Sequence, residues 1–117
     1  MTAPAEFALK VYRGDTYSWS FALWEDIERR QPVDLTGATP KAEIRAKPGG
    51  ELWVALPVAV TLPNVIVADL SADDSRKLAA KLGAWDLQLT LADGSVATVI
   101  AGGVFVTPDT TDSTDAP

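Results

Sequence analysis

Residues 85–91 alternate between apolar and polar side chains, which is the pattern of a strand with one buried face. The apolar side is formed by Trp85, Leu87, Leu89 and Leu91, and the polar side by Asp86, Gln88 and Thr90. The turn pair Asp93-Gly94 follows, and residues 95–106 form a second extended segment. The pattern therefore predicts a β-hairpin near the end of the sequence.

A helix-start signal precedes this hairpin. Ser71 is a favourable N-cap residue, and Asp74 lies at the spacing of a capping box. Three residues are typical of a helix C-terminus: Lys77, Lys81 and Gly83. We therefore predict a short helix over residues 72–82.

Five earlier segments have the composition of short strands separated by turns. They are residues 6–12, 16–23, 40–47, 52–60 and 65–70. Residues 16–23 alternate most regularly, so we expect them to form a core strand. Pro57 removes a backbone donor from residues 52–60, which predicts an edge position for that segment.

Seven or eight short strands with one helix predict an all-β fold, an immunoglobulin-like Greek-key β-sandwich in which the short helix crosses between the sheets. The 117 residues leave room for one domain. We expect this sandwich to occupy residues 1–107. Residues 108–117, rich in Asp, Thr and Pro, are expected to form an acidic and flexible tail.

The composition argues against catalysis. The sequence contains no cysteine and no histidine, which removes thiolate and imidazole chemistry and the commonest zinc ligands. Helix capping explains the acids at Asp69, Asp73 and Asp74 better than a metal site does. We expect no catalytic, metal-binding or cofactor-binding residue. A hydrolase built on carboxylates would need a pocket enclosing two acids about 5 to 10 Å apart, and no such pocket is expected.

The net charge of −6 comes from 16 acidic and 10 basic residues. Such a chain repels phosphate backbones, so no nucleic-acid partner is expected. No apolar stretch approaches the roughly 20 residues that span a bilayer, so no membrane insertion is expected either. A protein or a sugar is the more plausible kind of partner.

The four tryptophans differ in their surroundings. Trp19 and Trp85 are in phase with apolar neighbours, which predicts core positions. Trp24 begins the charged segment 24–32, which we expect to project as a loop, and Trp53 lies in the predicted edge segment. Large aromatic and arginine side chains anchor many interfaces. The predicted partner-binding residues are therefore Trp24, Arg29, Arg30 and Trp53. Alternatively, the two rings cover the open ends of the sandwich.

Short motifs along the sequence carry a family resemblance. They are Tyr-Arg-Gly-Asp-Thr-Tyr (12–17), Pro-Val-Asp-Leu-Thr-Gly-Ala (32–38), Ala-Glu-Ile-Arg (42–45), Leu-Ser-Ala-Asp-Asp (70–74), Gly-Ala-Trp-Asp-Leu-Gln-Leu (83–89), Ala-Asp-Gly (92–94) and Ala-Gly-Gly-Val-Phe-Val-Thr-Pro-Asp (101–109). Together they resemble small immunoglobulin-like proteins of tailed-bacteriophage and prophage structural modules, a group that includes the N-terminal domain of baseplate upper proteins. One departure is Trp85, which stands where the group often has a tyrosine, so the tether that a tyrosine hydroxyl offers is expected to be missing.

The resemblance implies a non-enzymatic virion structural protein, attached to the tail, baseplate or connector. It would act through contacts with other virion proteins, in symmetric multiple copies, after assembly in the cytoplasm of the bacterial host. Two alternatives remain open. One is a capsid decoration protein. The other is a carbohydrate-binding module that uses Trp24 and Trp53 as coplanar stacking platforms for host cell-wall polysaccharide.

Overall fold

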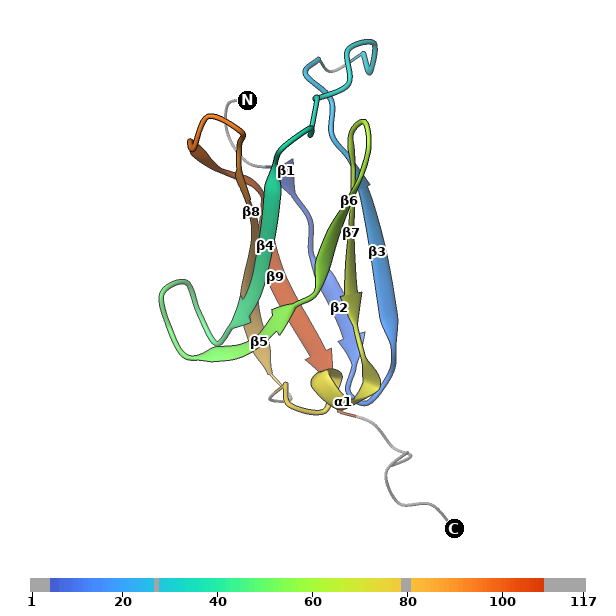
Figure 1. Cartoon of the computed structure of the whole chain (residues 1–117). Coiled ribbons are helices and arrows are strands. Elements are labelled where there is room, and N and C mark those ends of the chain that lie inside the picture. Colours follow the sequence, from blue (N-terminus) through green and yellow to red (C-terminus); the bar gives the residue numbers. More distant parts are fainter. Residues whose placement is uncertain (1–4, 27, 79–80, 109–117) are drawn as a thin grey trace.

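The computed structural model describes residues 5–26, 28–78 and 81–108 as two β-sheets packed face to face (Figure 1). The larger sheet has the order β1-β9-β8-β4-β5, with β2 also paired to β9, and the smaller sheet has the order β3-β7-β6. The strands are β1 (Ala5–Glu6), β2 (Leu9–Tyr12), β3 (Tyr17–Ala22), β4 (Thr39–Arg45), β5 (Leu52–Leu56), β6 (Val58–Thr61), β7 (Val65–Leu70), β8 (Leu82–Thr90) and β9 (Val96–Thr107). Helix α1 (Ala72–Ser75) joins β7 to β8.

The chain moves between the two sheets several times. It leaves the larger sheet for β3, returns for β4 and β5, leaves again for β6 and β7, and returns through α1 for β8 and β9. This connectivity is that of an immunoglobulin-like Greek-key sandwich, so the predicted fold class is confirmed, including the helix that crosses between the sheets. The core lies between the sheets, where Ile44, Ile66 and Leu87 are fully buried.

The predicted strand over residues 6–12 is divided in two. Both β1 and β2 run parallel to β9, with Glu6 opposite Ala101 and Leu9 opposite Val104. Between them the Phe7 carbonyl accepts a hydrogen bond from Trp85 Nε1 instead of continuing the ladder. The strand is therefore interrupted where this side chain reaches it.

The predicted edge strand over residues 52–60 is also two strands. β5 lies at the edge of the larger sheet and β6 at the edge of the smaller one, so the edge position was correct but the single strand was not. Pro57 stands between them, where the chain changes sheets. A proline suits this place because no ladder donor is needed there.

The predicted core strand over residues 16–23 is β3, which lies at an edge of the smaller sheet. Its inward side chains are only partly buried, Trp19 among them, whereas Trp85 is 3% exposed. Trp85 fills the core as predicted, whereas Trp19 packs against the core and stays partly exposed. An edge strand has a neighbour on one side only, which leaves its inward side chains partly open to solvent.

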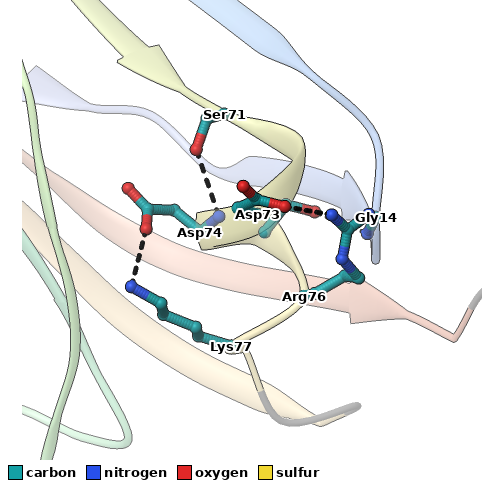
Figure 2. Close-up of polar contacts among 7 residues, drawn as sticks. Gly14, Ser71, Asp73, Asp74, Arg76 and Lys77 are labelled. Atoms are coloured by element: carbon teal, nitrogen blue, oxygen red, sulfur yellow. Dashed lines mark hydrogen bonds and ion pairs between the residues drawn. The ribbon is translucent and has the colours of Figure 1, made fainter. Parts of the chain in front are cut away.

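Helix α1 is much shorter than the helix predicted over residues 72–82. Ser71 caps it as predicted, because its Oγ accepts from the backbone N–H of Asp74 at 3.1 Å (Figure 2). Lys77 lies beyond the helix, and its Nζ pairs with the Asp74 carboxylate at 2.9 Å. The predicted N-cap at Ser71 is therefore confirmed, and the predicted length of the helix was wrong.

Tertiary contacts end the helix early. Arg13 Nε donates to the carbonyl oxygens of Arg76 and Leu78, both at 3.1 Å. Ser75 is buried, and its Oγ accepts from the Gly14 backbone N–H at 2.6 Å. The turn between β2 and β3 thus satisfies groups that a longer helix would have paired internally.

Strand β9 ends at Thr107. The tail predicted for residues 108–117 lies, apart from Pro108, outside the described residues. Within the part of the chain that the structure describes, no helix is long and apolar enough to cross a bilayer.

Candidate partner-binding surfaces

The loop over residues 24–32 is held in shape by backbone and side-chain contacts. Trp24 and Pro32 form an isolated antiparallel bridge at its base. The Asp26 carboxylate accepts from the backbone N–H groups of Arg30 at 3.0 Å and Gln31 at 2.9 Å. The loop extends beyond the ends of the neighbouring strands (Figure 1), which confirms that this segment projects.

The two predicted arginines differ in their contacts. Arg30 pairs with the exposed Glu28 carboxylate at 3.0 Å, which is an exposed pair of little energetic weight. Arg29 has a positive φ of 58°, and its backbone N–H donates to the Asp26 carbonyl at 3.2 Å. The Arg29 side chain is exposed and lines a hollow that Trp24 also lines.

This hollow, which we call the lateral opening, lies at the side of the sandwich between β1 and β3. It has a volume of about 470 Å³ and is bordered by Ala5, Glu6, Phe7, Ser20, Phe21, Ala22, Leu23, Trp24, Arg29 and Ile100. The rings of Phe7 and Phe21 meet edge to face, with their centroids 5.2 Å apart. Phe7 remains 42% exposed, so apolar surface is accessible here.

Trp53 lies away from the lateral opening, on β5 at the other edge of the larger sheet (Figure 1). Its partly buried ring covers Gly83, where a Cβ added to the glycine would come within 2.5 Å of the ring. Gly83 therefore gives the indole room within β8 and does not end a helix as predicted. This arrangement favours the alternative in which Trp53 covers an open end of the sandwich.

The structure does not bring Trp24 and Trp53 together. Trp24 follows the end of β3 at the base of the projecting loop, and Trp53 belongs to β5 in the other sheet. Both rings are partly buried. A sugar platform made of two coplanar exposed rings therefore has no counterpart in this arrangement.

A second hollow, which we call the outer groove, lies on the outer face of the larger sheet. Its volume is about 700 Å³. Its polar lining residues are Glu6, Lys41, Glu43, Arg45, Lys47, Asp86 and Gln88. The small residues Ala84, Ala101 and Gly102 form its floor, with the β4–β5 turn at one side. This groove was not predicted from the sequence, where its signal is the run of small residues on adjacent strands.

Three charged residues of the outer groove, Lys41, Glu43 and Arg45, form ion pairs with one another. Glu43 stands directly opposite Asp86 across the β4–β8 ladder. Its carboxylate also contacts Arg45 Nη2 at 2.9 Å and Lys41 Nζ at 3.8 Å. Three acids, Glu6, Glu43 and Asp86, line this hollow, which is an open sheet face, and Glu43 is engaged by two cations. The arrangement suits contact with a polar protein surface.

No metal-binding cluster occurs in the described ranges, where no three His, Cys, Asp or Glu residues lie close enough to hold an ion. The groups whose pKa is shifted lie instead in turns and near the start of α1. Hydrogen bonds from Thr36 lower the pKa of Asp34, and those from Ser95 lower the pKa of Asp93. The Lys77 ammonium donates a hydrogen bond to the Asp74 carboxylate and is attracted by its charge, and both effects raise the pKa of Lys77. These shifts reflect local structure.

Comparison with known proteins adds little to the geometry. No family model matches the sequence, and no curated protein is significantly similar to it. Among solved structures, CopC from Methylosinus trichosporium OB3b is 14% identical over 95% of this chain and 90% of that chain, with a TM-score of 0.47. Fibronectin(III)-like modules of CbhA from Clostridium thermocellum are 12% identical over 92% of this chain and 93% of theirs, with a TM-score of 0.44. Neither likeness indicates a function or a partner.

Proposed function

We propose that this protein is a non-enzymatic structural subunit of a tailed-bacteriophage virion, located at the tail, baseplate or connector and acting through protein–protein contacts. The motif resemblance described above supplies the virion context. The lateral opening, with its accessible Phe7 and the flanking Trp24 and Arg29, is the observation that carries the binding role. Aromatic and arginine side chains of this kind are enriched where proteins bind one another.

The shape of the molecule is consistent with a scaffold that presents surfaces. The core is filled by apolar side chains from both sheets, and the two hollows lie on the outside of the sandwich. The outer groove offers mixed charges, which favour register and specificity in a contact more than raw affinity. Neighbouring subunits would therefore meet a rigid body at defined places.

Fractionated particles test this proposal. Heads, tails and whole virions from a phage that encodes this sequence would be separated on a density gradient, and the protein would be quantified in each fraction by mass spectrometry against known head and tail proteins. A fixed ratio to tail proteins is the expected result. A fixed ratio to the major capsid protein would instead establish the decoration alternative. Presence only in the soluble lysate would refute a virion role.

The carbohydrate alternative has its own measurement. Cell-wall polysaccharide from the host would be titrated into the purified protein while tryptophan fluorescence is followed. Saturable quenching that is lost in Trp24→Ala but kept in Trp53→Ala would place a sugar site at the lateral opening. No saturable change is expected if the opening contacts protein.

A further inference from the structure

Among the described residues, strand β3 has one hydrogen-bonded neighbour, β7, and no described strand pairs with its other edge, which we call the free edge. The ladder places Tyr17 opposite Leu70, and the same register continues to Leu23 opposite Asn64. The backbone N–H of Leu23 donates to the Asn64 carbonyl at 2.8 Å. In an antiparallel ladder the hydrogen-bonded residues alternate along each strand. The odd-numbered residues of β3 therefore face β7, and the even-numbered residues direct their backbone groups outward.

The pairing on the other side of β7 agrees with this assignment. The backbone N–H of Asp69 donates to the Pro57 carbonyl at 3.0 Å, so the odd-numbered residues of β7 face β6. The backbone groups of the even-numbered residues of β7 therefore hydrogen-bond to β3. The outward N–H and C=O groups on the free edge consequently belong to Ser18, Ser20 and Ala22, which are all exposed residues.

This edge lacks the features with which sheet proteins usually prevent edge-to-edge pairing, namely proline, charge and bulges. The strand reads Tyr-Ser-Trp-Ser-Phe-Ala, without proline or charge, and its register with β7 is continuous over its six residues. The opposite edge of the same sheet is different, because β6 has only four residues and lies between Pro57 and Pro63. The edge strand β5 is followed by Pro57, and the ladder that joins it to β4 contains a register shift.

We propose that β3 pairs antiparallel with β3 of a second copy of this chain, about a two-fold axis at Ser20. This register sets Ser20 opposite Ser20 and Ser18 opposite Ala22, so every outward backbone group finds a partner. Each hydrogen-bonded pair exchanges two bonds. The two small sheets then join into one continuous sheet, and the interface is isologous, as in most two-fold dimers.

The side chains along β3 are compatible with pairing to β3 of a second copy. On the outer face only serine and alanine meet, so no like charges oppose one another. On the inner face the register places Trp19 opposite Phe21 of the other copy on each side of the axis. These are non-hydrogen-bonded positions, where side chains come closest, and both residues are only partly buried in the single chain. These aromatic cross-strand pairs thus bury apolar surface that is exposed to solvent in a single copy.

The lateral opening borders this edge, because Ser20, Phe21 and Ala22 line it. A second β3 laid against the edge would therefore also cover apolar surface around Phe7. The proposal concerns the purified protein alone and does not depend on the virion context, so it can fail or hold independently of the proposed function.

Single cysteine variants test the register, since the protein has no cysteine of its own. In the proposed dimer the Cα atoms of the two Ser20 residues lie about 5.5 Å apart, within disulfide range. Ser20→Cys should therefore form a covalent dimer under mild oxidation. Ser18→Cys is the matched control, because the two copies of that position lie roughly 14 Å apart at about 3.4 Å per residue. The double variant Ser18→Cys/Ala22→Cys should crosslink again.

Sedimentation provides a second measurement that needs no crosslink. The unmodified protein is expected to sediment as a dimer at high concentration. Ser20→Lys places two charges opposite each other on the exposed face. It should raise the dissociation constant of the dimer at least tenfold. Ala59→Lys on β6, an exposed edge position of the same sheet, should leave the dimer unchanged. Monomers at all concentrations, equal crosslinking of Ser18→Cys and Ser20→Cys, or dissociation by Ala59→Lys alone would overturn the proposal.

Discussion

The Nε1 atom of Trp85 donates a hydrogen bond to the carbonyl oxygen of Phe7 at 2.8 Å. This bond ties β8 to the N-terminal segment between β1 and β2. Gly102 on β9 makes the approach possible, because a Cβ there would overlap the same carbonyl oxygen. A tether was expected to be missing where tryptophan replaces tyrosine. The indole N–H supplies one in place of the hydroxyl.

Replacing Trp85 with phenylalanine should destabilise the protein. The variant leaves the Phe7 carbonyl without its donor, which costs about 1 to 3 kcal/mol, and the smaller ring loses further packing. Denaturant unfolding measures the change in free energy. Trp53→Phe is the matched control, because that indole is partly buried and donates no hydrogen bond to any residue in the described part of the chain. Equal losses in the two variants would show that the Trp85 bond contributes nothing.

Replacing Gly102 with alanine should destabilise the sandwich through steric overlap. The added methyl group would meet the Phe7 backbone, which cannot move without disturbing the pairing of β1 and β2 with β9. We expect a loss of about 1 to 3 kcal/mol or more in the free energy of unfolding. Gly103→Ala serves as the control, since its nearest neighbour is the flexible end of the Phe105 side chain at 3.3 Å. A smaller effect at Gly102 than at Gly103 would contradict the described packing.

Ser75→Ala tests why α1 is short. Ser75 is fully buried, and its Oγ accepts from the Gly14 N–H at 2.6 Å. Removing the hydroxyl leaves that donor unpaired, with an expected loss of about 1 to 3 kcal/mol. Ser20→Ala, at an exposed position, should have little effect on the free energy of unfolding when both proteins are compared as monomers. A neutral Ser75→Ala would mean that another contact ends the helix.

The pH response of the β8–β9 turn can be measured directly. Ser95 donates to the Asp93 carboxylate from its Oγ at 2.6 Å and from its backbone N–H at 2.9 Å, which lowers the pKa of Asp93. The stabilisation that accompanies a lowered pKa is present above the ordinary value of 3.8 and is lost as the pH falls through the folded-state pKa. Ser95→Ala should raise the pKa of Asp93 toward its ordinary value in a carboxyl NMR titration. Asp34, held by Thr36, should titrate unchanged.

Much of the fold could be predicted because alternation reports which face of a strand is buried. The period of two at Trp85, Leu87 and Leu89 identified β8, and Asp93-Gly94 identified its turn, where Gly94 has a φ of 89°. The helix length could not be predicted, because the contacts of Arg13 and Ser75 join residues more than 60 positions apart.

The binding surfaces were harder to predict than the fold. Trp24 and Arg29 were predicted as interface residues, and they line one hollow. Trp53 was predicted with them from its aromatic ring and its edge segment, and it lies instead over Gly83. The residues of β3 that direct their backbone groups to the free edge are those that do not hydrogen-bond to β7. The pairing of β3 with Leu70 and Asn64 determines which residues these are. A single sequence contains no direct signal for register between distant strands.

The most direct test of the proposed virion role is a cryo-EM reconstruction of an intact particle that carries this protein. Repeated copies of the sandwich are expected at the tail, baseplate or connector, with Phe7, Trp24 and Arg29 buried against neighbouring chains. Copies whose lateral opening faces solvent, or a particle without the protein, would contradict that role.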